Sequence, residues 1–302
     1  MTNLSKAVLI TGCSSGIGRA TAELLAQRGW NVYATARRVE SIADLEGKGC
    51  KVLALDVCDE ASMQAAVASV EQAEGAVGAL VNNAGYSQSG AVEEVPMELV
   101  RRQFETNVFG LLRMCQLVLP GMRRQRWGRI VNISSMGGRM TFPGGGAYHG
   151  SKHAVEAISD ALRFEVRSFG VDVVVVEPGL IKTAFGETAA DSVSGTGVDG
   201  GDYADFNDAV ARATVEAYDG PLARLGGGPE TVARTIEKAL TRRRPKTRYP
   251  VTASARMILA QRRLLPDRAW DAFLGTQFPH PGRRPNRATR RLETLRGCET
   301  AS

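Results

Sequence analysis

The stretch "AYHGSK" (147–152) holds a tyrosine, Tyr148, and a lysine, Lys152, four residues apart. On a helix, residues four apart lie on one face, so the ammonium group would sit near the phenol. A free tyrosine has a pKa of about 10, and a nearby positive charge favours the phenolate and lowers that pKa. The pair could therefore exchange a proton with a substrate near neutral pH. It could also be an ordinary aromatic and a lysine at the head of a helix.

The histidine between them, His149, suggests a second chemistry, because two serines end the run "GRIVNISS" shortly upstream. A serine hydrolase would need a G-x-S-x-G turn and an acid to orient the imidazole, and the sequence offers neither. A residue directly after Tyr148 on a helix also points away from the phenol. The sequence therefore favours His149 as a wall or interface residue over a catalytic base.

A glycine-rich segment, "LITGCSSGIGRA" (9–20), joins an apolar run to a helical pattern. Glycine is required where the backbone φ is positive, or where phosphate oxygens come too close for a Cβ. The helix that follows would present free N–H groups and its positive dipole end to a phosphate. The spacing is G-x-x-x-G-x-G, whereas the commonest dinucleotide fingerprint is G-x-G-x-x-G. Its place between a strand and a helix favours a dinucleotide site over an empty tight turn.

The end of the second apolar run, "VYATARR" (32–38), indicates which dinucleotide. An acidic residue here would hydrogen-bond the ribose hydroxyls of NAD, whereas an arginine accommodates the additional phosphate of NADP. Arg37 and Arg38 stand at this end, and a guanidinium can hold a phosphate by two parallel hydrogen bonds. The sequence favours NADP(H) over NAD(H), unless both arginines are solvated surface charges. Asp56, after the third run, could accept from the adenine amino group or cap the next helix.

The elements that would position these residues alternate along the first two-thirds of the chain. Short, nearly continuous apolar runs alternate with helical patterns, which indicates βαβ units and a parallel sheet buried on both faces. The predicted fold class is α/β, a single Rossmann-type doubly wound parallel sheet with helices on both faces. The expected strands are 7–11, 31–35, 51–57, 79–83, 128–134 and 171–178, and the expected helices between them are 17–28, 60–73, 97–125 and 149–168.

The texture of the sequence changes after Pro178. Residues 179–208 are rich in Gly, Ser and Asp and read as a long loop with little regular structure, which is usually functional in a compact domain. Helical patterns return at 207–219, 229–244 and 252–265. We therefore expect one catalytic domain over 1–278, with a helical substrate lid at 184–225 and a C-terminal extension. A basic, disordered tail is expected at 279–302.

The composition is that of a globular protein, with 43% hydrophobic and 23% charged residues and a net charge of +6. Much of the positive excess lies late in the chain, where it could bind nucleic acid or a membrane, but a solvated terminus is the simpler interpretation. The five cysteines form no CxxC pair and no ligand spacing with the three histidines, so no metal is expected. No signal peptide or membrane span is evident, and we expect a cytoplasmic protein.

Six motifs in order make the chain similar to a known superfamily. They are "TGCSSGIG", "NNAG" (82–85), "NVFG" (107–110), "NISS" (132–135), "YHGSK" (148–152) and "PGLIKT" (178–183). This set resembles the signature of the short-chain dehydrogenase/reductase superfamily, over about the first 185 residues. The remainder is similar to the branch that holds 17β-hydroxysteroid and retinol dehydrogenases and acyl-dihydroxyacetone-phosphate reductases.

The resemblance implies an oxidoreductase that transfers a hydride between a nicotinamide and a carbonyl or secondary alcohol. Tyr148 would be the general acid/base, and Lys152 would lower its pKa and hold the nicotinamide ribose. Ser135, rather than Ser134, would hydrogen-bond the substrate oxygen, and Asn107 would hold a water in a proton relay. The other implied cofactor contacts are Gly12, Ser14, Ser15, Gly16, Ile17, Gly18, Arg37, Arg38, Asp56, Val57, Asn83, Ala84, Gly85, Pro178, Gly179, Ile181 and Thr183. Thr183 could alternatively cap a helix.

Substrate specificity is expected from the segments that match the superfamily least. The expected substrate contacts are Ser135, Met136, Phe142, Tyr148 and Phe185. A largely apolar pocket suits a steroid, retinoid, fatty or polyketide-like ketone, although Arg139, Lys182 and Arg224 could instead hold a phosphorylated acyl ketone.

Two further expectations concern turnover and assembly. A protein that senses NADP(H) without turnover is a rival reading, against which the intact Ser135, Tyr148 and Lys152 argue. As in relatives, the helices 97–125 and 149–168 are expected to pair in a homodimer or homotetramer.

Overall fold

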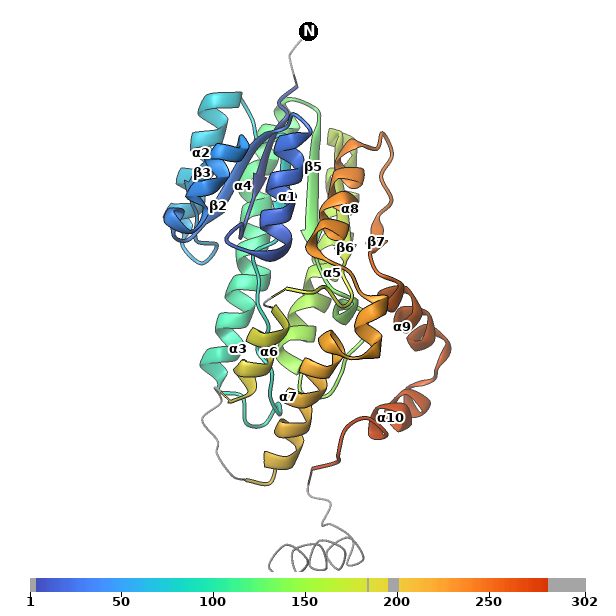
Figure 1. Cartoon of the computed structure of the whole chain (residues 1–302). Helices are drawn as coiled ribbons and strands as arrows, with labels where there is room; N and C mark the ends of the chain where they lie inside the picture. The colour runs from blue at the N-terminus through green and yellow to red at the C-terminus, as the bar shows by residue number, and fades with distance from the viewer. Residues whose placement is uncertain (1–3, 184, 195–200, 282–302) are drawn as a thin grey trace, which may run out of the picture.

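The computed structural model describes residues 4–183, 185–194 and 201–281. Within them, seven parallel strands form one sheet in the order β3-β2-β1-β4-β5-β6-β7 (Figure 1). The predicted doubly wound α/β fold is therefore confirmed. The strands are β1 (Ala7–Ile10), β2 (Asn31–Ala36), β3 (Lys51–Ala54), β4 (Ala79–Asn82), β5 (Gly128–Ile133), β6 (Val171–Glu177) and β7 (Arg248–Pro250).

Helices cover both faces of the sheet, which explains the continuous apolar runs of its strands. Helices α1 (Gly16–Gln27) and α8 (Pro229–Thr241) pack on one face, where Val8 and Ile10 of β1 join their core. Helices α2 (Glu60–Glu74), α4 (Leu111–Arg124) and α5 (Gly146–Val166) pack on the other, where Ala7 and Leu9 point. Every second residue of β1 thus serves one of two hydrophobic cores.

The prediction of one continuous α-helix over 97–125 is wrong in the middle of that range. Helix α3 (Met97–Phe104) is followed by one π-helical turn (Glu105–Gly110) before α4 begins. A Cβ on Gly110 would lie 2.4 Å from the carbonyl oxygen of Val57, so this turn packs tightly against the segment that follows β3. Asn107 lies in the same turn and is buried. Tertiary contacts that helical periodicity does not encode therefore set this distortion, as is common near functional sites.

The long loop expected over 179–208 is also wrong, because α6 (Phe185–Ser194) forms within it and α7 (Ala204–Asp219) begins before it ends. Ala189, Ala190 and Val193 of α6 are buried. Gly186 lies so close to α7 that a Cβ there would approach the Tyr218 ring to 2.7 Å. Packing against α7 thus stabilises a helix whose Gly, Ser and Asp content predicts none.

The C-terminal part adds α9 (Ala253–Leu264), which was expected, and β7 and α10 (Asp267–Gly275), which were not. Strand β7 is short and ends in proline, as suits an edge strand. Helices α6, α7, α9 and α10 lie beyond the carboxyl ends of the strands (Figure 1). Across the described residues, no helix has the length and apolar character needed to cross a membrane. Most of the expected tail, 282–302, lies outside the described residues, as do 184 and 195–200 of the expected lid.

Candidate active site

The glycine loop follows β1, at the point where the strand order reverses between β1 and β4. Open α/β sheets bind ligands at such a switch point. Gly12 and Gly16 have φ of +73° and +57°, a backbone region that other residues rarely adopt. Helix α1 starts after Ser15, whose side chain makes no capping bond, and its first turn holds no acidic residue. The N–H groups of this helix end are therefore free for an anion.

The end of β4 braces this loop. The Asn83 side-chain amide donates to the carbonyl oxygens of Thr11 (3.0 Å) and Gly12 (2.9 Å). In return, the Thr11 hydroxyl accepts from the backbone N–H groups of Asn83 and Ala84, both at 3.0 Å. Asn83 thus directs its side chain into the loop. The sequence reasoning missed Thr11, although its place at a strand end beside glycine is a usable signal.

A cavity of about 1590 Å³ runs along the carboxyl edge of the sheet from this loop to the C-terminal helices. It brings together most of the side chains predicted to form the site. Those that line it are Gly12, Ser14, Ser15, Gly16, Ile17, Arg37, Asp56, Val57, Asn83, Ala84, Gly85, Ser135, Met136, Phe142, Tyr148, Lys152, Pro178, Gly179, Ile181, Thr183 and Phe185. Gly18, Arg38 and Asn107 do not line it.

At the nucleotide end of the cavity, the two arginines Arg37 and Arg38 differ in position. Arg37 is exposed, lines the cavity and makes no ion pair with any described residue, whereas Arg38 directly precedes the 3₁₀ segment Val39–Lys48 and does not line the cavity. Asp56 accepts from the backbone N–H of Cys58 at 2.9 Å. The side chain that caps α2 is Asp59, so the alternative role of Asp56 as a helix cap is not needed. Arg37 and Asp56 thus both face the cavity at this end.

Tyr148 and Ser135 meet at the centre of the cavity. Burial raises the pKa of the Tyr148 phenol, and its hydrogen bond with the Ser135 side chain partly opposes this rise. The Ser135 oxygen also accepts from the backbone N–H of Gly137 at 3.0 Å, so its one hydrogen is left to donate to Tyr148 or to a bound substrate. Ser134, by contrast, is buried, and its hydroxyl has no hydrogen-bond partner among the described residues. The raised pKa is the reverse of what the Tyr–Lys spacing predicts.

The position of Lys152 accounts for that difference. Its ammonium donates to the carbonyl oxygen of Ile133 at 2.9 Å and lies 5.9 Å from the centre of the Tyr148 ring. Burial lowers the pKa of Lys152 to about 8, while the nearby Glu156 opposes the shift. The desolvation of the phenol therefore outweighs any influence of this ammonium.

Asn107 lies behind the cavity. Its amide donates to the Tyr86 carbonyl oxygen (3.0 Å) and to the Ser151 hydroxyl (3.1 Å), and its oxygen accepts from the Tyr86 N–H (3.1 Å). A Cβ on Gly85 would lie 3.0 Å from that oxygen and 3.6 Å from the Lys152 ammonium. Asn107 therefore ties the segment after β4 to α5 immediately beside Lys152.

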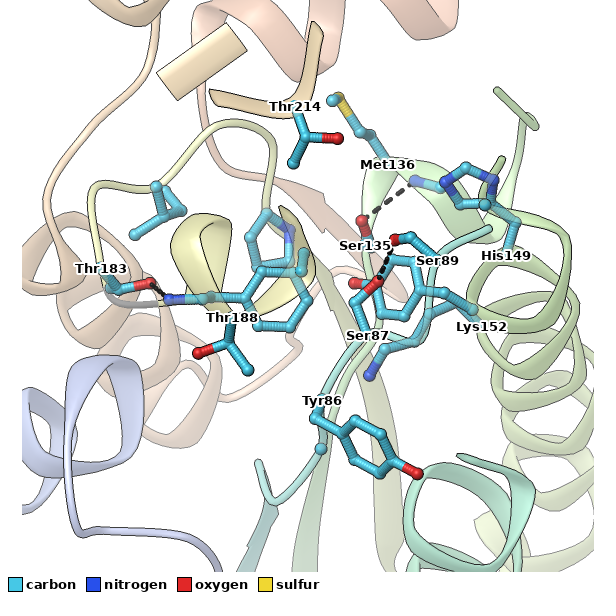
Figure 2. Close-up of a pocket in the computed structure, with 18 of the residues that line it drawn as sticks. Tyr86, Ser87, Ser89, Ser135, Met136, His149, Lys152, Thr183, Thr188 and Thr214 are labelled. Carbon is cyan, nitrogen blue, oxygen red and sulfur yellow. Dashed lines mark hydrogen bonds between the residues drawn. The ribbon is translucent and has the colours of Figure 1, made fainter. Parts of the chain in front are cut away.

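The substrate end of the cavity combines apolar walls with several hydroxyl groups. Figure 2 shows Ser87, Ser89 and Ser135 on the side of Lys152, with Thr183 and Thr188 across from them. The Thr183 hydroxyl accepts from the backbone N–H of Phe185 at 3.3 Å, so it caps α6 while lining the cavity. The sequence reasoning missed the apolar walls that Val210, Met257, Ile258, Phe273 and Phe278 supply, because they come from the chain beyond the recognised motifs.

A second feature not found from the sequence is a buried carboxylate, Glu177, at the end of β6. It is fully buried, and Arg139 and Arg248 approach it to 3.5 Å each. Burial raises its pKa to about 7, Glu156 adds to the shift, and the two arginines oppose it. Through Arg139 and Arg248, Glu177 thus links the end of β6 to the segment after Ser135 and to β7.

These features define a dinucleotide-binding α/β protein, in which Ser135, Tyr148 and Lys152 line the cavity that the glycine loop borders. The family model described as short chain dehydrogenase matches residues 6–193. The chain therefore belongs to the short-chain dehydrogenase/reductase family and is an enzyme of that class, as the motifs predicted. The fold of this family binds a nicotinamide nucleotide.

Relatives of known description cover most of the chain. The 3-ketodihydrosphingosine reductase of Bacteroides thetaiotaomicron is 37% identical over 86% of this chain and 93% of its own length. The NADPH-dependent 3-dehydrocapnine reductase of Ornithobacterium rhinotracheale is 36% identical over 87% of this chain and 94% of its own length. A crystal structure of a short-chain dehydrogenase from Streptomyces avermitilis matches with a TM-score of 0.72 and 33% identity, over 85% of this chain and 92% of that one.

Proposed function

We propose that the protein is an NADP(H)-dependent oxidoreductase, which transfers a hydride between the nicotinamide and the carbonyl or secondary alcohol carbon of a mostly apolar substrate. The observation that carries this proposal is one shared cavity. Ser135, Tyr148 and Lys152 line it together with the glycine loop and Arg37. A proton donor, a dinucleotide loop and a phosphate-binding cation thus face one space.

The residues at the nucleotide end fit a phosphorylated dinucleotide. The uncapped start of α1 suits the pyrophosphate, and Arg37, with no ion-pair partner in the described chain, suits the additional phosphate of NADP. Asp56 would meet the adenine. The name of the relative from Ornithobacterium, an NADPH-dependent reductase, supports the same preference.

In the reducing direction, bound NADPH supplies the hydride, and the side chains of this chain supply the proton and the alignment. Ser135 donates to the substrate carbonyl oxygen, because the Gly137 N–H already occupies the other side of its hydroxyl. Tyr148 gives its proton to the oxygen as negative charge develops there. Burial keeps Tyr148 protonated until that moment, which suits an acid.

After that transfer, Lys152 stabilises the phenolate, since its ammonium lies on the same side of α5. Asn107 contributes by holding Gly85 and Ser151 in place around Lys152. Its side-chain amide bonds to protein groups at both ends, so a relay water would need the second lone pair of its oxygen.

The substrate end favours an apolar ketone over a phosphorylated one. Met136, Phe142 and Phe185 line the cavity, with further apolar side chains from α7, α9 and α10. Arg139, Lys182 and Arg224, the cations that could hold a phosphate, do not line it. Both named relatives are described as reductases, which is consistent with carbonyl reduction.

A panel of carbonyl compounds tests this function. The purified protein is mixed with NADPH or NADH and each compound, and the loss of cofactor absorbance is followed. We expect steady oxidation of NADPH with apolar ketones and slower oxidation of NADH. Tight NADPH binding without turnover on any carbonyl would instead favour the cofactor-sensing protein.

A further inference from the structure

His149 occupies a slot that only glycine permits. A Cβ on Gly137 would lie 2.5 Å from Cδ2 of the imidazole, and a Cβ on Gly145 would lie 2.5 Å from its Cε1. The Phe142 ring meets the imidazole edge to face, at 6.2 Å between centroids. The ring is thus held from both sides and cannot swing out of the cavity wall without moving the backbone.

One hydrogen bond fixes the tautomer of this histidine. The backbone N–H of Phe142 donates to His149 Nδ1 at 3.2 Å, so Nδ1 is the acceptor and Nε2 carries the hydrogen. Burial lowers the pKa of His149 to about 4, and the neighbouring His153 adds to this shift. The imidazole therefore stays neutral at physiological pH, with one N–H donor.

That donor faces the cavity. His149 lines it, and Nε2 has no hydrogen-bond partner in the described part of the chain, yet it is not among the fully enclosed unpaired atoms. A Cβ on Gly137 would lie 2.9 Å from Nε2 and 3.5 Å from the Ser135 oxygen, so both polar atoms border one small space. The His149 and Tyr148 rings are 5.5 Å apart, closer than helical periodicity predicts (Figure 2 shows His149 beside Ser135).

We propose that His149 is a specificity residue, whose Nε2–H donates to a second, neutral oxygen of the substrate close to the reacting carbonyl. The inference rests on the proposed function and narrows its substrate class. The favoured substrates are apolar-chain ketones that carry a hydroxyl, ester or other acceptor oxygen within a few bonds of the carbonyl carbon. A neutral donor suits a neutral acceptor, and the cations that line the cavity, Arg37, Arg102 and Lys152, lie at its nucleotide end or at Tyr148.

The test compares two substrates in two variants. The substrates are the methyl ester of a medium-chain β-keto acid and the straight-chain ketone of equal chain length and carbonyl position. His149→Phe keeps a ring in the slot but removes both nitrogens, and His149→Gln restores an N–H donor. His153→Phe is the matched control, because His153 is exposed one turn further along α5 and does not line the cavity.

The readout is the ratio of kcat/KM for the ester to kcat/KM for the ketone. We expect His149→Phe to lower this ratio about tenfold, His149→Gln to recover part of it, and His153→Phe to leave it unchanged. An equal loss on both substrates would overturn the proposal, since it would mean that His149 only shapes the site. Circular dichroism and NADPH affinity show whether each variant is folded.

The failure of the proposed function is distinguishable from this result. If the wild-type protein binds NADPH but reduces neither of these two substrates nor any carbonyl compound of the panel, the proposed carbonyl reduction is wrong. The dissociation constants of the two ketones in the NADP⁺ complex then test His149 alone. A preference for the ester that His149→Phe removes supports the contact, and equal binding in both proteins contradicts it.

Discussion

The Asn83 side chain donates a hydrogen bond to the carbonyl oxygen of Gly12 at 2.9 Å, across the switch point of the sheet. This bond connects the end of β4 to the loop after β1, the two segments between which the nucleotide would lie. Gly18, on the first turn of α1, packs directly against this hydrogen bond. A Cβ there would come within 2.3 Å of the same carbonyl oxygen and 2.5 Å of the Asn83 amide nitrogen.

Gly18→Ala should therefore disrupt the loop. We expect the free energy of unfolding to fall by about 1–3 kcal/mol, because the methyl group must displace backbone, and NADPH affinity to fall at least about tenfold. Urea denaturation and fluorescence titration measure the two effects. Gly47→Ala is the matched control, since a Cβ there meets nothing within 4 Å. Equal behaviour of the two variants would contradict the described packing.

Arg37→Ala should weaken NADPH binding about tenfold to a hundredfold and leave NADH binding within about twofold. The reason is that only NADPH carries the phosphate that a charge-assisted hydrogen bond would hold. Arg38→Ala should have the smaller effect, because Arg38 does not line the cavity. Titration of each variant with both cofactors measures this. Parallel losses for NADPH and NADH would refute the phosphate role.

The rate of NADPH-driven reduction should be level at lower pH and fall as the pH rises above about 8. Burial lowers the pKa of Lys152 to about 8, so its ammonium is charged below that pH and neutral above it. Kinetics of kcat/KM against pH would show the fall. Lys152→Arg should be slower but lack this fall, because a guanidinium keeps its charge throughout the range. The same fall in both proteins would assign it to another group.

Glu177 should make the protein less stable as the pH rises from about 4.5 to about 7. Its pKa is raised to about 7 in the folded state, so the folded protein binds the proton more tightly than the unfolded chain in that window. The free energy of unfolding of wild type should therefore fall by about 1–3 kcal/mol more than that of Glu177→Gln when the pH is raised from about 5 to about 7.5. Urea denaturation at both pH values measures this. Glu46→Gln, an exposed control, should fall as much as wild type, and an unchanged pH dependence in Glu177→Gln would contradict the assignment.

The sheet could be predicted because its strands are buried on both faces and so read as continuous apolar runs, as "VDVVVVEP" does. Helix α6 could not, since its stability comes from α7 packed at Gly186 rather than from its own residues. The π-helical turn at Asn107 likewise depends on Val57 and Tyr86, which are distant in the sequence.

The residues of the site could be predicted from motifs that follow one another in a fixed order along the sequence. The orientation of their side chains relative to one another could not be predicted. The spacing of Tyr148 and Lys152 predicts a lowered tyrosine pKa, whereas burial raises that pKa, and the Lys152 ammonium donates to Ile133 at the end of β5. The role of His149 as part of the cavity wall depends on two glycines in a loop whose path the sequence does not reveal.

The central claim, that Tyr148 is the proton donor in a cavity shared with the cofactor, is tested most directly by Tyr148→Phe. NADPH oxidation with the best ketone and NADPH affinity are measured together in this variant. We expect kcat to fall about a thousandfold, since the proton donor is lost, while the NADPH dissociation constant stays within about twofold. Turnover that persists near the wild-type rate would contradict the account.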